Sequence, residues 1–324
     1  MDEQNNKPDL EENKNGEGNN TESGDGFRNE IVPRISPITA GIIGLVGGFF
    51  LYQIVGGLLT LLIFGVNLQN APVNSLRLMT MAGQTLFILL PALVFSKMFY
   101  EDVTEIIRFH LPKLEEILLF GAGIIILTPL LQYYIAIQEY FIDTWAQSSA
   151  LINSIKTNLD KLNSLVDKTY GNLLSAHSVF EVVLVVIVVS VVPAICEETM
   201  FRGFIMRSFE FKMKPVWAAL LTAVFFGIYH FNPYGLIPLI GLGFYFGFAA
   251  YKSNSIFVPM SLHFFNNFIA IIFYFIYGDE DIINSSVSKG FDLGSTAAAF
   301  VLLFALFGIL LFFIHRYYSR KKIV

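Results

Sequence analysis

Long apolar segments separated by short polar ones dominate the pattern of the chain. A helix that crosses the hydrocarbon core of a bilayer, about 30 Å thick, needs about 20 mostly apolar residues. Eight segments fit or approach this length. Two of them, the fifth and the sixth, are short, and the turn Asn232-Pro233-Tyr234-Gly235 separates these two. The pattern therefore predicts an all-α polytopic membrane protein with about eight transmembrane helices. The eight segments are Ile38–Val66, Leu78–Phe95, Ile117–Ile137, Val179–Cys196, Val216–His230, Leu236–Tyr251, Ile256–Tyr277 and Gly294–Ile314.

The longest polar connection, Glu139–Ser178, has a helical pattern of its own. Apolar side chains recur in it at a spacing of three or four residues, with polar residues between them, which favours an amphipathic helix. We expect this helix to lie on the outer surface of the membrane. The apolar positions are Leu151, Ile152, Ile155, Leu159, Leu162, Val166, Tyr170 and Leu173.

Lysine and arginine are distributed unequally between the two sides that eight spans define. The positive-inside rule assigns the richer side to the cytoplasm, and an even number of spans puts both termini there. The poorer side holds only Arg77, Lys156, Lys161, Lys168 and Lys289. The richer side holds Arg28, Arg34, Lys97, Arg108, Lys113, Arg202, Arg207, Lys212, Lys214, Lys252, Arg316, Arg320, Lys321 and Lys322.

Composition agrees with a lipid environment. The chain is 54% hydrophobic and 15% charged, with a mean hydropathy of +0.60, whereas soluble domains are about 25% charged. The net charge of −5 comes from residues 1–35, which hold nine of the 26 acidic and four of the 21 basic residues and leave 17 of each sign in the remainder. This tail has few large apolar groups, so we expect it to be a disordered cytoplasmic segment. Cys196 is the one cysteine, which excludes an internal disulfide and a cysteine-rich metal site.

A few polar residues interrupt the apolar segments. An ionisable side chain at the bilayer centre costs at least about 2.5 to 3.5 kcal/mol, so such residues are functional candidates. A lone histidine or asparagine within the membrane is more often an interhelical hydrogen-bonding group, as we expect for Asn266, but a joint cluster is harder to explain in that way. The candidates are Glu197, Glu198, His230, His263, Asn266 and Asn267.

Spacing divides these candidates between two tasks. Residues four positions apart share a helix face, so Glu198 can pair with Arg202 and has a structural role. Glu197 points about 100° away and has no partner in its own helix. Phe226 with His230, and His263 with Asn267, have the same four-residue spacing.

The positions of the candidate residues along their helices indicate that their side chains can lie close together. If the fourth helix continues toward Lys212 and the fifth begins near Pro215, Glu197 and His230 lie level, each about 24 to 26 Å from the turn at 1.5 Å per residue. His263 and Asn267 lie about 12 and 18 Å from the start of their own helix. We therefore predict one buried, water-accessible cavity reached from the cytoplasmic side.

Two chemistries fit these residue types. A buried carboxylate beside a histidine can activate water as a general base, and an asparagine amide with a second histidine can stabilise an oxyanion, which together describe peptide-bond hydrolysis. Alternatively, Glu197, His230 and His263 match the ligand types of a hydrolytic zinc site. We prefer the metal-free chemistry, because the sequence has no HExxH motif and asparagine is a poor zinc ligand. Zinc stays a possible cofactor.

The three motifs resemble those of a known family. Glu197-Glu198-x-x-x-Arg202, Phe226-x-x-x-His230 and His263-x-x-x-Asn267, within residues 179–277, look like the signature of the CPBP family, bacterial and archaeal relatives of the type II CAAX prenyl endopeptidases that are also called Abi proteins. The resemblance implies an eight-helix bundle around a conical, cytoplasm-facing cavity.

The resemblance also implies roles for single residues. Glu197 and His230 would activate water, His263 and Asn267 would hold the oxyanion, and Arg202 would pair with Glu198 and shape the site together with Phe226. Members of the family are often called metalloproteases, and the resemblance alone does not decide the metal question.

The sequence thus predicts an intramembrane endopeptidase, a CAAX prenyl protease-like hydrolase, in a bacterial plasma membrane. Its domains would be the tail 1–35, a protease-like membrane domain 36–316 and a basic cytoplasmic C-terminus 317–324. We expect lipid and a membrane-associated, possibly lipidated, protein or peptide as partners, and no nucleic acid. The alternative is a non-catalytic bacteriocin self-immunity or scaffolding protein. A transporter is disfavoured, since its polar groups would line a path across both leaflets.

Overall fold

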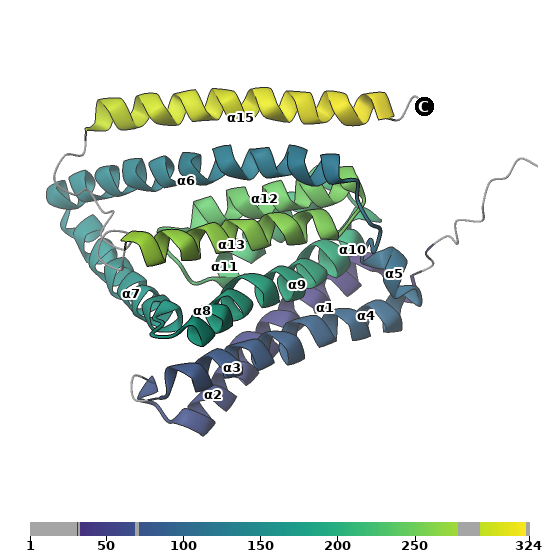
Figure 1. Ribbon diagram of the computed structural model, residues 1–324, viewed down its shortest axis with the longest axis horizontal. Helices are drawn as coiled ribbons and strands as arrows, with labels where there is room; N and C mark the ends of the chain where they lie inside the picture. Colours follow the sequence, from purple (N-terminus) through teal and green to yellow (C-terminus); the bar gives the residue numbers. More distant parts are fainter. Residues whose placement is uncertain (1–30, 32, 69–70, 278–291, 322–324) are drawn as a thin grey trace, which may run out of the picture. The chain divides into compact units, whose positions relative to one another are not determined.

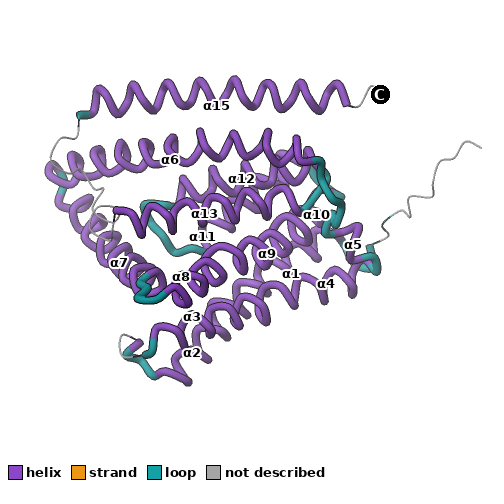
Figure 2. The backbone as a smooth tube through the Cα atoms, in the orientation of Figure 1, coloured by secondary structure: helices purple, strands orange, loops and turns teal. Residues whose placement is uncertain are grey.

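The computed structural model describes residues 31, 33–68, 71–277 and 292–321, and the regular elements in these ranges are all helices (Figure 2). The predicted tail 1–35 therefore lies almost entirely outside the described residues. In the predicted C-terminus 317–324, residues 317–321 continue the last helix and residues 322–324 are not described.

The helices follow the predicted apolar segments in order (Figure 1). The first, second and fourth spans contain π-helical turns, labelled η. The first span comprises α1 (Pro37–Phe49), η1 (Phe50–Gly56) and α2 (Gly57–Phe64), and the second comprises α3 (Val73–Gln84), η3 (Thr85–Leu89) and α4 (Leu90–Tyr100). The fourth comprises α8 (Val179–Val186), η4 (Ile187–Val191), α9 (Val192–Glu198), η5 (Thr199–Ile205) and α10 (Met206–Glu210). The others are α5 (Val103–Ile106), α6 (Leu114–Ser148), α7 (Ala150–Leu174), α11 (Pro215–Tyr229), α12 (Leu236–Ser253), α13 (Phe257–Tyr277) and α15 (Leu293–Lys321).

The prediction of an all-α polytopic membrane protein is confirmed, but the count of eight full spans is not. Seven helices in the described residues are long and apolar enough to cross a bilayer. The remaining predicted segment, the fifth along the chain, is α11, which has 15 residues. At 1.5 Å per residue it measures about 22 Å, less than the hydrocarbon thickness of about 30 Å.

The early end of α11 places irregular backbone among the spans. Such backbone is tolerated at membrane depth only where protein or a water-filled cavity satisfies its polar groups. The Gln53 side chain donates to the carbonyl oxygen of Tyr229 at 2.8 Å, and the Gln138 side chain donates to that of Tyr234 at 3.1 Å. The side-chain oxygen of Asn232 accepts from the Gly235 N–H at 2.7 Å. Side chains from other parts of the chain therefore stabilise the turn after α11.

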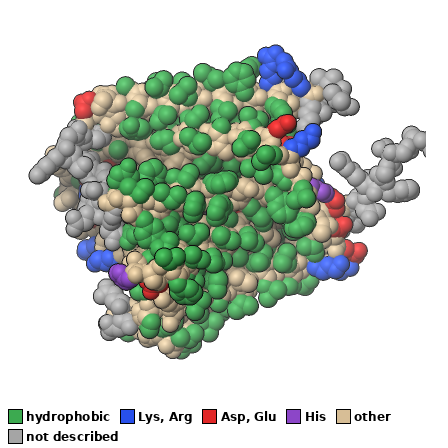
Figure 3. Space-filling model, in the orientation of Figure 1, with side chains coloured by type: hydrophobic (Ala, Val, Ile, Leu, Met, Phe, Trp, Pro, Cys, Tyr) green, Lys and Arg blue, Asp and Glu red, His purple; other side chains and the backbone are tan. Residues whose placement is uncertain are grey.

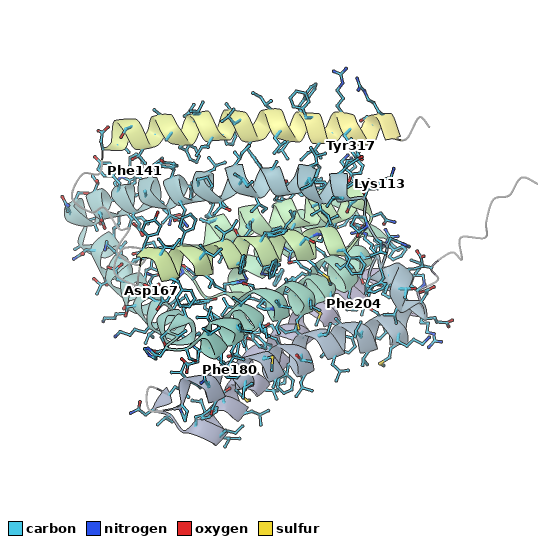
Figure 4. All side chains as sticks on the ribbon, in the orientation of Figure 1. Lys113, Phe141, Asp167, Phe180, Phe204 and Tyr317 are labelled. Carbon is cyan, nitrogen blue, oxygen red and sulfur yellow. The ribbon has the colours of Figure 1, made fainter. Side chains whose placement is uncertain are left out.

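Helix α7 lies across one end of the spans, which we call the α7 end (Figure 1). Phe141, Asp167 and Phe180 lie at this end, and Lys113 and Tyr317 lie at the opposite end (Figure 4). Figure 3 shows a broad apolar face between the two ends, with the coloured charged groups gathered at the ends, as expected for lipid-facing helices.

Caps and an arginine hold α7 in place. Its N-cap is Ser149, a single residue after α6, whose hydroxyl accepts from the Ile152 N–H at 3.4 Å. At the other end, the fully buried Arg77 of α3 donates to the carbonyl oxygens of Leu173, at 3.0 Å, and Ser175. A cation at a helix C-terminus also complements the helix dipole. The predicted amphipathic helix is therefore present, and hydrogen bonds from Arg77 connect its C-terminal end to α3.

Three arginines counted in the charge asymmetry are buried and face neither headgroups nor water. Arg77, Arg108 and Arg202 are each at most 1% exposed. Arg108 forms an ion pair with Glu210 at the end opposite α7. The remaining lysines and arginines keep the same bias, and the cytoplasmic location of the termini stays a prediction.

Two apolar clusters form the packed interior. One joins α1, α4, α9, η5, α10 and α11, and the other joins α6, α12, α13 and α15. Phe226 belongs to the first cluster and Leu242 to the second, and both line the same cavity. The candidate site therefore lies where the two clusters meet.

Candidate functional site

A cavity of about 570 Å³ lies within the helical bundle, and we call it the large chamber. Residues of η1, α3, α7, α9, α12 and α13 line it, together with the end of α11. The four residues predicted to carry the chemistry all contribute to its wall, and Phe226 does so as well. These four are Glu197, His230, His263 and Asn267.

Glu197 is half-buried in the wall of the large chamber. Its Oε1 accepts a long hydrogen bond, 3.5 Å, from the Gln84 side chain. Its Oε2 is buried and has no hydrogen-bond partner among the residues that the structure describes. Buried polar atoms are nearly always paired, so a carboxylate oxygen of this kind needs a functional or solvent explanation.

His230 follows the last helical residue of α11 and has a defined tautomer. Its Nδ1 lies 2.7 Å from the carbonyl oxygen of Phe226. A carbonyl oxygen only accepts, so we assign the N–H to Nδ1, which leaves Nε2 of the neutral ring as an acceptor. The ring also packs against the Phe226 ring, with centroids 4.7 Å apart.

Glu198 and Arg202 form the predicted pair, with 2.8 Å between Oε1 and Nη1. Both side chains are buried, and Arg202 also donates to the carbonyl oxygen of Gly243 at 3.0 Å. The guanidinium lies 4.4 Å from the centroid of the Phe226 ring, a distance typical of a cation–π contact. The pair therefore joins η5 to α11 and α12 beneath the large chamber.

His263 is hydrogen-bonded to the same carboxylate, that of Glu198. Its Nδ1 lies 2.8 Å from Glu198 Oε1, and its ring stacks on Phe246 with 5.4 Å between centroids. The carboxylate accepts, so the Nδ1 proton is committed to Glu198. To donate to an oxyanion, His263 needs a second proton on Nε2, a condition that the motif spacing did not reveal.

The two asparagines differ in position and partners. Asn267 donates from Nδ2 to the Val189 carbonyl oxygen at 2.9 Å, and its amide group has a second N–H to offer. Asn266 donates to Asn267 Oδ1 at 3.2 Å and accepts from the Thr128 hydroxyl at 3.3 Å. Asn266 thus links α13 to α6, which confirms its predicted interhelical role.

Sequence reasoning missed several residues of the chamber wall. Gln53 and Gln84 are uncharged, so they do not stand out in a search for ionisable groups, although an amide within an apolar segment is itself a signal. Tyr170 comes from α7, which was predicted to lie on the membrane surface. The surrounding protein, and next the Glu197 carboxylate, raise the pKa of the Tyr170 phenol to about 12, so that it stays a hydrogen-bond donor.

The zinc alternative requires Glu197, His230 and His263 to point at one ion. Within the described ranges, no three histidine, cysteine, aspartate or glutamate side chains are grouped so that they could hold a metal. Nδ1 of both histidines is engaged, by Phe226 in one case and by Glu198 in the other, which leaves Nε2 of each ring available and is also the usual arrangement of a metal-binding histidine. Because the side chains are not grouped around one point in the described residues, they do not fit a three-ligand site as they lie, and we derive no step through a metal.

The structure does not confirm the side from which the chamber is reached. Leu165, Val166, Thr169, Tyr170, Leu173 and Leu174 of α7 all line it. The chamber therefore extends toward the α7 end, which the distribution of lysine and arginine assigns to the outer side. The prediction of a cytoplasm-facing cavity is not confirmed, because depth counted along single helices does not show which end of the bundle is open.

Comparisons with known proteins match the region that carries the three motifs. Residues 179–269 match the family model described as type II CAAX prenyl endopeptidase Rce1-like. This segment of the chain is similar to the Rce1-like family. That segment contains Glu197, His230, His263 and Asn267, so the four residues that meet at the large chamber all lie inside the Rce1-like region.

A curated relative matches part of the chain. It is named "Putative membrane peptidase YdiL", from Bacillus subtilis (strain 168), and is 34% identical over 89 residues. The match covers 28% of this chain and 36% of the relative, so the chain matches about a third of that protein's length. No solved structure matched the chain. The Rce1-like family and this relative support a membrane protease at the level of the family.

Proposed function

We propose that the chain is an intramembrane endopeptidase that hydrolyses a peptide bond of a membrane-associated protein or peptide. One observation carries the proposal: Glu197, His230, His263 and Asn267, from three different helical segments, line one cavity inside an Rce1-like membrane domain. Isolated polar residues that only hold helices together would be expected to make close hydrogen bonds to neighbouring helices, whereas Glu197 lines the cavity and, among the described residues, accepts only the long bond of 3.5 Å from Gln84.

The proposed reaction begins with a water molecule between Glu197 and His230. Glu197, or Nε2 of His230, takes a proton from the water, and the water oxygen attacks the carbonyl carbon of the substrate. The carbonyl π-bond opens to an oxyanion, which accepts from the free N–H of Asn267 and, when its Nε2 is protonated, from His263. The C–N bond then breaks, and the proton held by the base passes to the leaving amine.

Glu198 and Arg202 have a different role in this proposal. Their charges compensate each other, and Glu198 orients His263 through its Nδ1. Neither side chain lines the large chamber. They are therefore positioning residues, which hold the site without contacting the substrate.

The substrate and the reaction can be tested together in cells. We expect cells that carry the wild-type chain to contain cleaved membrane proteins or peptides that are absent from cells carrying Glu197→Gln. Mass spectrometry of protein termini measures the difference. The control is Glu105→Gln, because Glu105 is a half-exposed carboxylate away from the chamber.

An identical set of termini in wild-type and Glu197→Gln cells, with equal amounts of protein, would contradict the protease proposal. It would favour the non-catalytic immunity or scaffolding role. Loss of the same termini in Glu105→Gln cells would instead show that the comparison reports membrane perturbation and would remove its support for Glu197.

A further inference from the structure

A second, smaller cavity of about 230 Å³ adjoins His230, and we call it the small chamber. Its wall comes from α6, α12 and the turn after α11, with one residue each from α7 and α13. The residues are Thr128, Leu131, Gln132, Ile135, Tyr170, His230, Asn232, Gly235, Pro238, Leu239, Leu242 and Asn266.

The two chambers share part of their walls. Tyr170, His230, Leu239, Leu242 and Asn266 line both. His230 therefore stands at the boundary, with the large chamber on its α3 side and the small chamber on its α6 side. An endopeptidase needs space on both sides of its reacting groups, because the substrate chain continues in both directions from the cleaved bond.

The small chamber is rich in uncharged polar groups for a site among membrane helices. Thr128, Gln132, Asn232 and Asn266 carry hydroxyl or amide groups. Each peptide unit of an extended substrate brings an N–H and a C=O that need partners away from water. Amides and hydroxyls can donate to and accept from such units without the desolvation cost of a buried charge.

The size of the small chamber limits what enters it. Pockets for drug-sized ligands measure about 300 to 1,000 Å³, so the small chamber is below that range and the large chamber is within it. One or two residues of a polypeptide fit the smaller space. The large chamber can hold a longer segment, and much of its α7 wall is apolar, as at Leu165, Val166 and Leu173.

A chain of hydrogen bonds connects the small chamber to the proposed oxyanion group. The Thr128 hydroxyl donates to Asn266 Oδ1, and Asn266 donates to Asn267 Oδ1. A substrate residue that contacts Thr128 or Asn266 would therefore orient the Asn267 amide, which connects occupancy of the small chamber with stabilisation of the oxyanion.

We propose that the small chamber is a substrate subsite that takes one or two residues on one side of the cleaved bond, while the large chamber takes the apolar segment on the other side. The substrate class is an extended polypeptide with a short part on one side of the bond and a longer part, packed on the apolar α7 wall, on the other. This inference rests on the proposed protease function.

The first experiment needs no activity. In the full chain with Cys196→Ser, held in lipid vesicles, Thr128→Cys and Leu127→Cys are treated with the small thiol reagent 2-aminoethyl methanethiosulfonate. Thr128 lines the small chamber, whereas the neighbouring Leu127 is 4% exposed in the packed core. We expect fast modification at 128 and slow modification at 127. Equal, slow modification at both positions would overturn the subsite, whether or not the protein cleaves anything.

The second experiment measures specificity. The purified full chain in vesicles is incubated with casein, and mass spectrometry gives the residues on each side of every cut. Gln132→Leu alters the small chamber and Leu165→Gln the large chamber, so each should change the residue preference on one side only, by about three- to tenfold for the gain or loss of one hydrogen bond.

The outcomes separate the two proposals. Preferences that stay unchanged, or that change on the same side in both variants, would overturn the subsite assignment while leaving the protease function in place. Casein cleavage by Glu197→Gln at the wild-type rate would overturn the proposed function itself. The labelling result decides in either case whether the small chamber is open.

Discussion

Two adjacent glutamates show how position determines role at the scale of single residues. Glu198 is fully buried, with its Oε1 bonded to both Arg202 and His263. Glu197 lines the large chamber, and among the described residues its carboxylate accepts only the long hydrogen bond from Gln84. The 100° rotation between successive helical residues accounts for the difference. A structural ion pair and a chemically available carboxylate can therefore be neighbours in sequence.

Part of this arrangement could be predicted from local spacing. The Glu198–Arg202 pair follows from a separation of four residues in one helix. The bond from His263 to Glu198 joins residues 65 positions apart, so no local pattern predicts it. For the same reason, the engagement of His263 Nδ1 becomes visible only in the folded chain.

Arg202→Ala should destabilise the protein strongly. It would leave the Glu198 carboxylate buried without its cation, and breaking a buried pair in this way costs about 3 to 5 kcal/mol. The exposed pair between Arg34 and Glu101 provides the control, because Arg34→Ala should cost at most about 1 kcal/mol. Thermal unfolding in detergent measures both variants, and an equal fall in Tm would contradict the assigned role of Arg202.

At the scale of elements, the π-helical turns surround the site. Tyr52 and Gln53 of η1, Ile88 of η3, Val188 of η4 and Phe201 of η5 all line the large chamber. π-Helical turns are rare and occur often at functional sites, because the extra residue shifts the side chains that follow it. Regular periodicity therefore locates these spans without revealing the π-helical turns within them.

Two of these turns have a cause in the sequence. Pro91 and Pro193 follow η3 and η4 within the first two residues of the next helix. Proline lacks an N–H and collides with the carbonyl of the preceding turn, and a local π turn accommodates both effects in a membrane helix. A proline in an apolar segment could thus have indicated a π-helical turn at η3 and η4, whereas no proline explains η1 and η5.

Close packing between α6 and α12 depends on Gly123. A Cβ atom built at this position would lie 2.0 Å from the Tyr245 hydroxyl, which donates to the Phe120 carbonyl oxygen at 2.7 Å. Gly123→Ala should therefore force Tyr245 away from α6, at a cost of about 1 to 3 kcal/mol for overpacking.

A matched control for that change lies two residues earlier in the same helix. Nothing is within 4 Å of a Cβ built at Gly121, so Gly121→Ala should be neutral or slightly stabilising. Thermal unfolding of the two variants in the same detergent measures the difference. A similar Tm for both would show that α6 and α12 do not approach as closely as described.

For the whole molecule, hydrophobic content and segment length were enough to locate the long apolar helices within the described residues, but not the four-residue helix α5. They were not enough to count full spans, because α11 was predicted as a span although it has 15 residues. They also did not predict that α7 lines the cavity, because amphipathicity shows that a helix has an apolar face and does not show what that face contacts.

The charge bias predicts which end of the bundle faces the cytoplasm. In a chain with Cys196→Ser, Ser154→Cys in α7 should react with a membrane-impermeant thiol reagent added to intact cells, and Lys212→Cys should react only after the cells are opened. Both positions are exposed in the structure. The reverse labelling pattern would place the α7 end, and with it the large chamber, on the cytoplasmic side.

The central claim is that Glu197 supplies chemistry and not stability. The most direct measurement is the cleavage rate of purified Glu197→Gln in vesicles, on a substrate identified from the termini of wild-type cells, together with its Tm. We predict that cleavage falls by about 10²- to 10⁴-fold, the usual contribution of a general base, while the Tm stays close to that of the wild type. Cleavage at the wild-type rate by the folded variant would contradict the account.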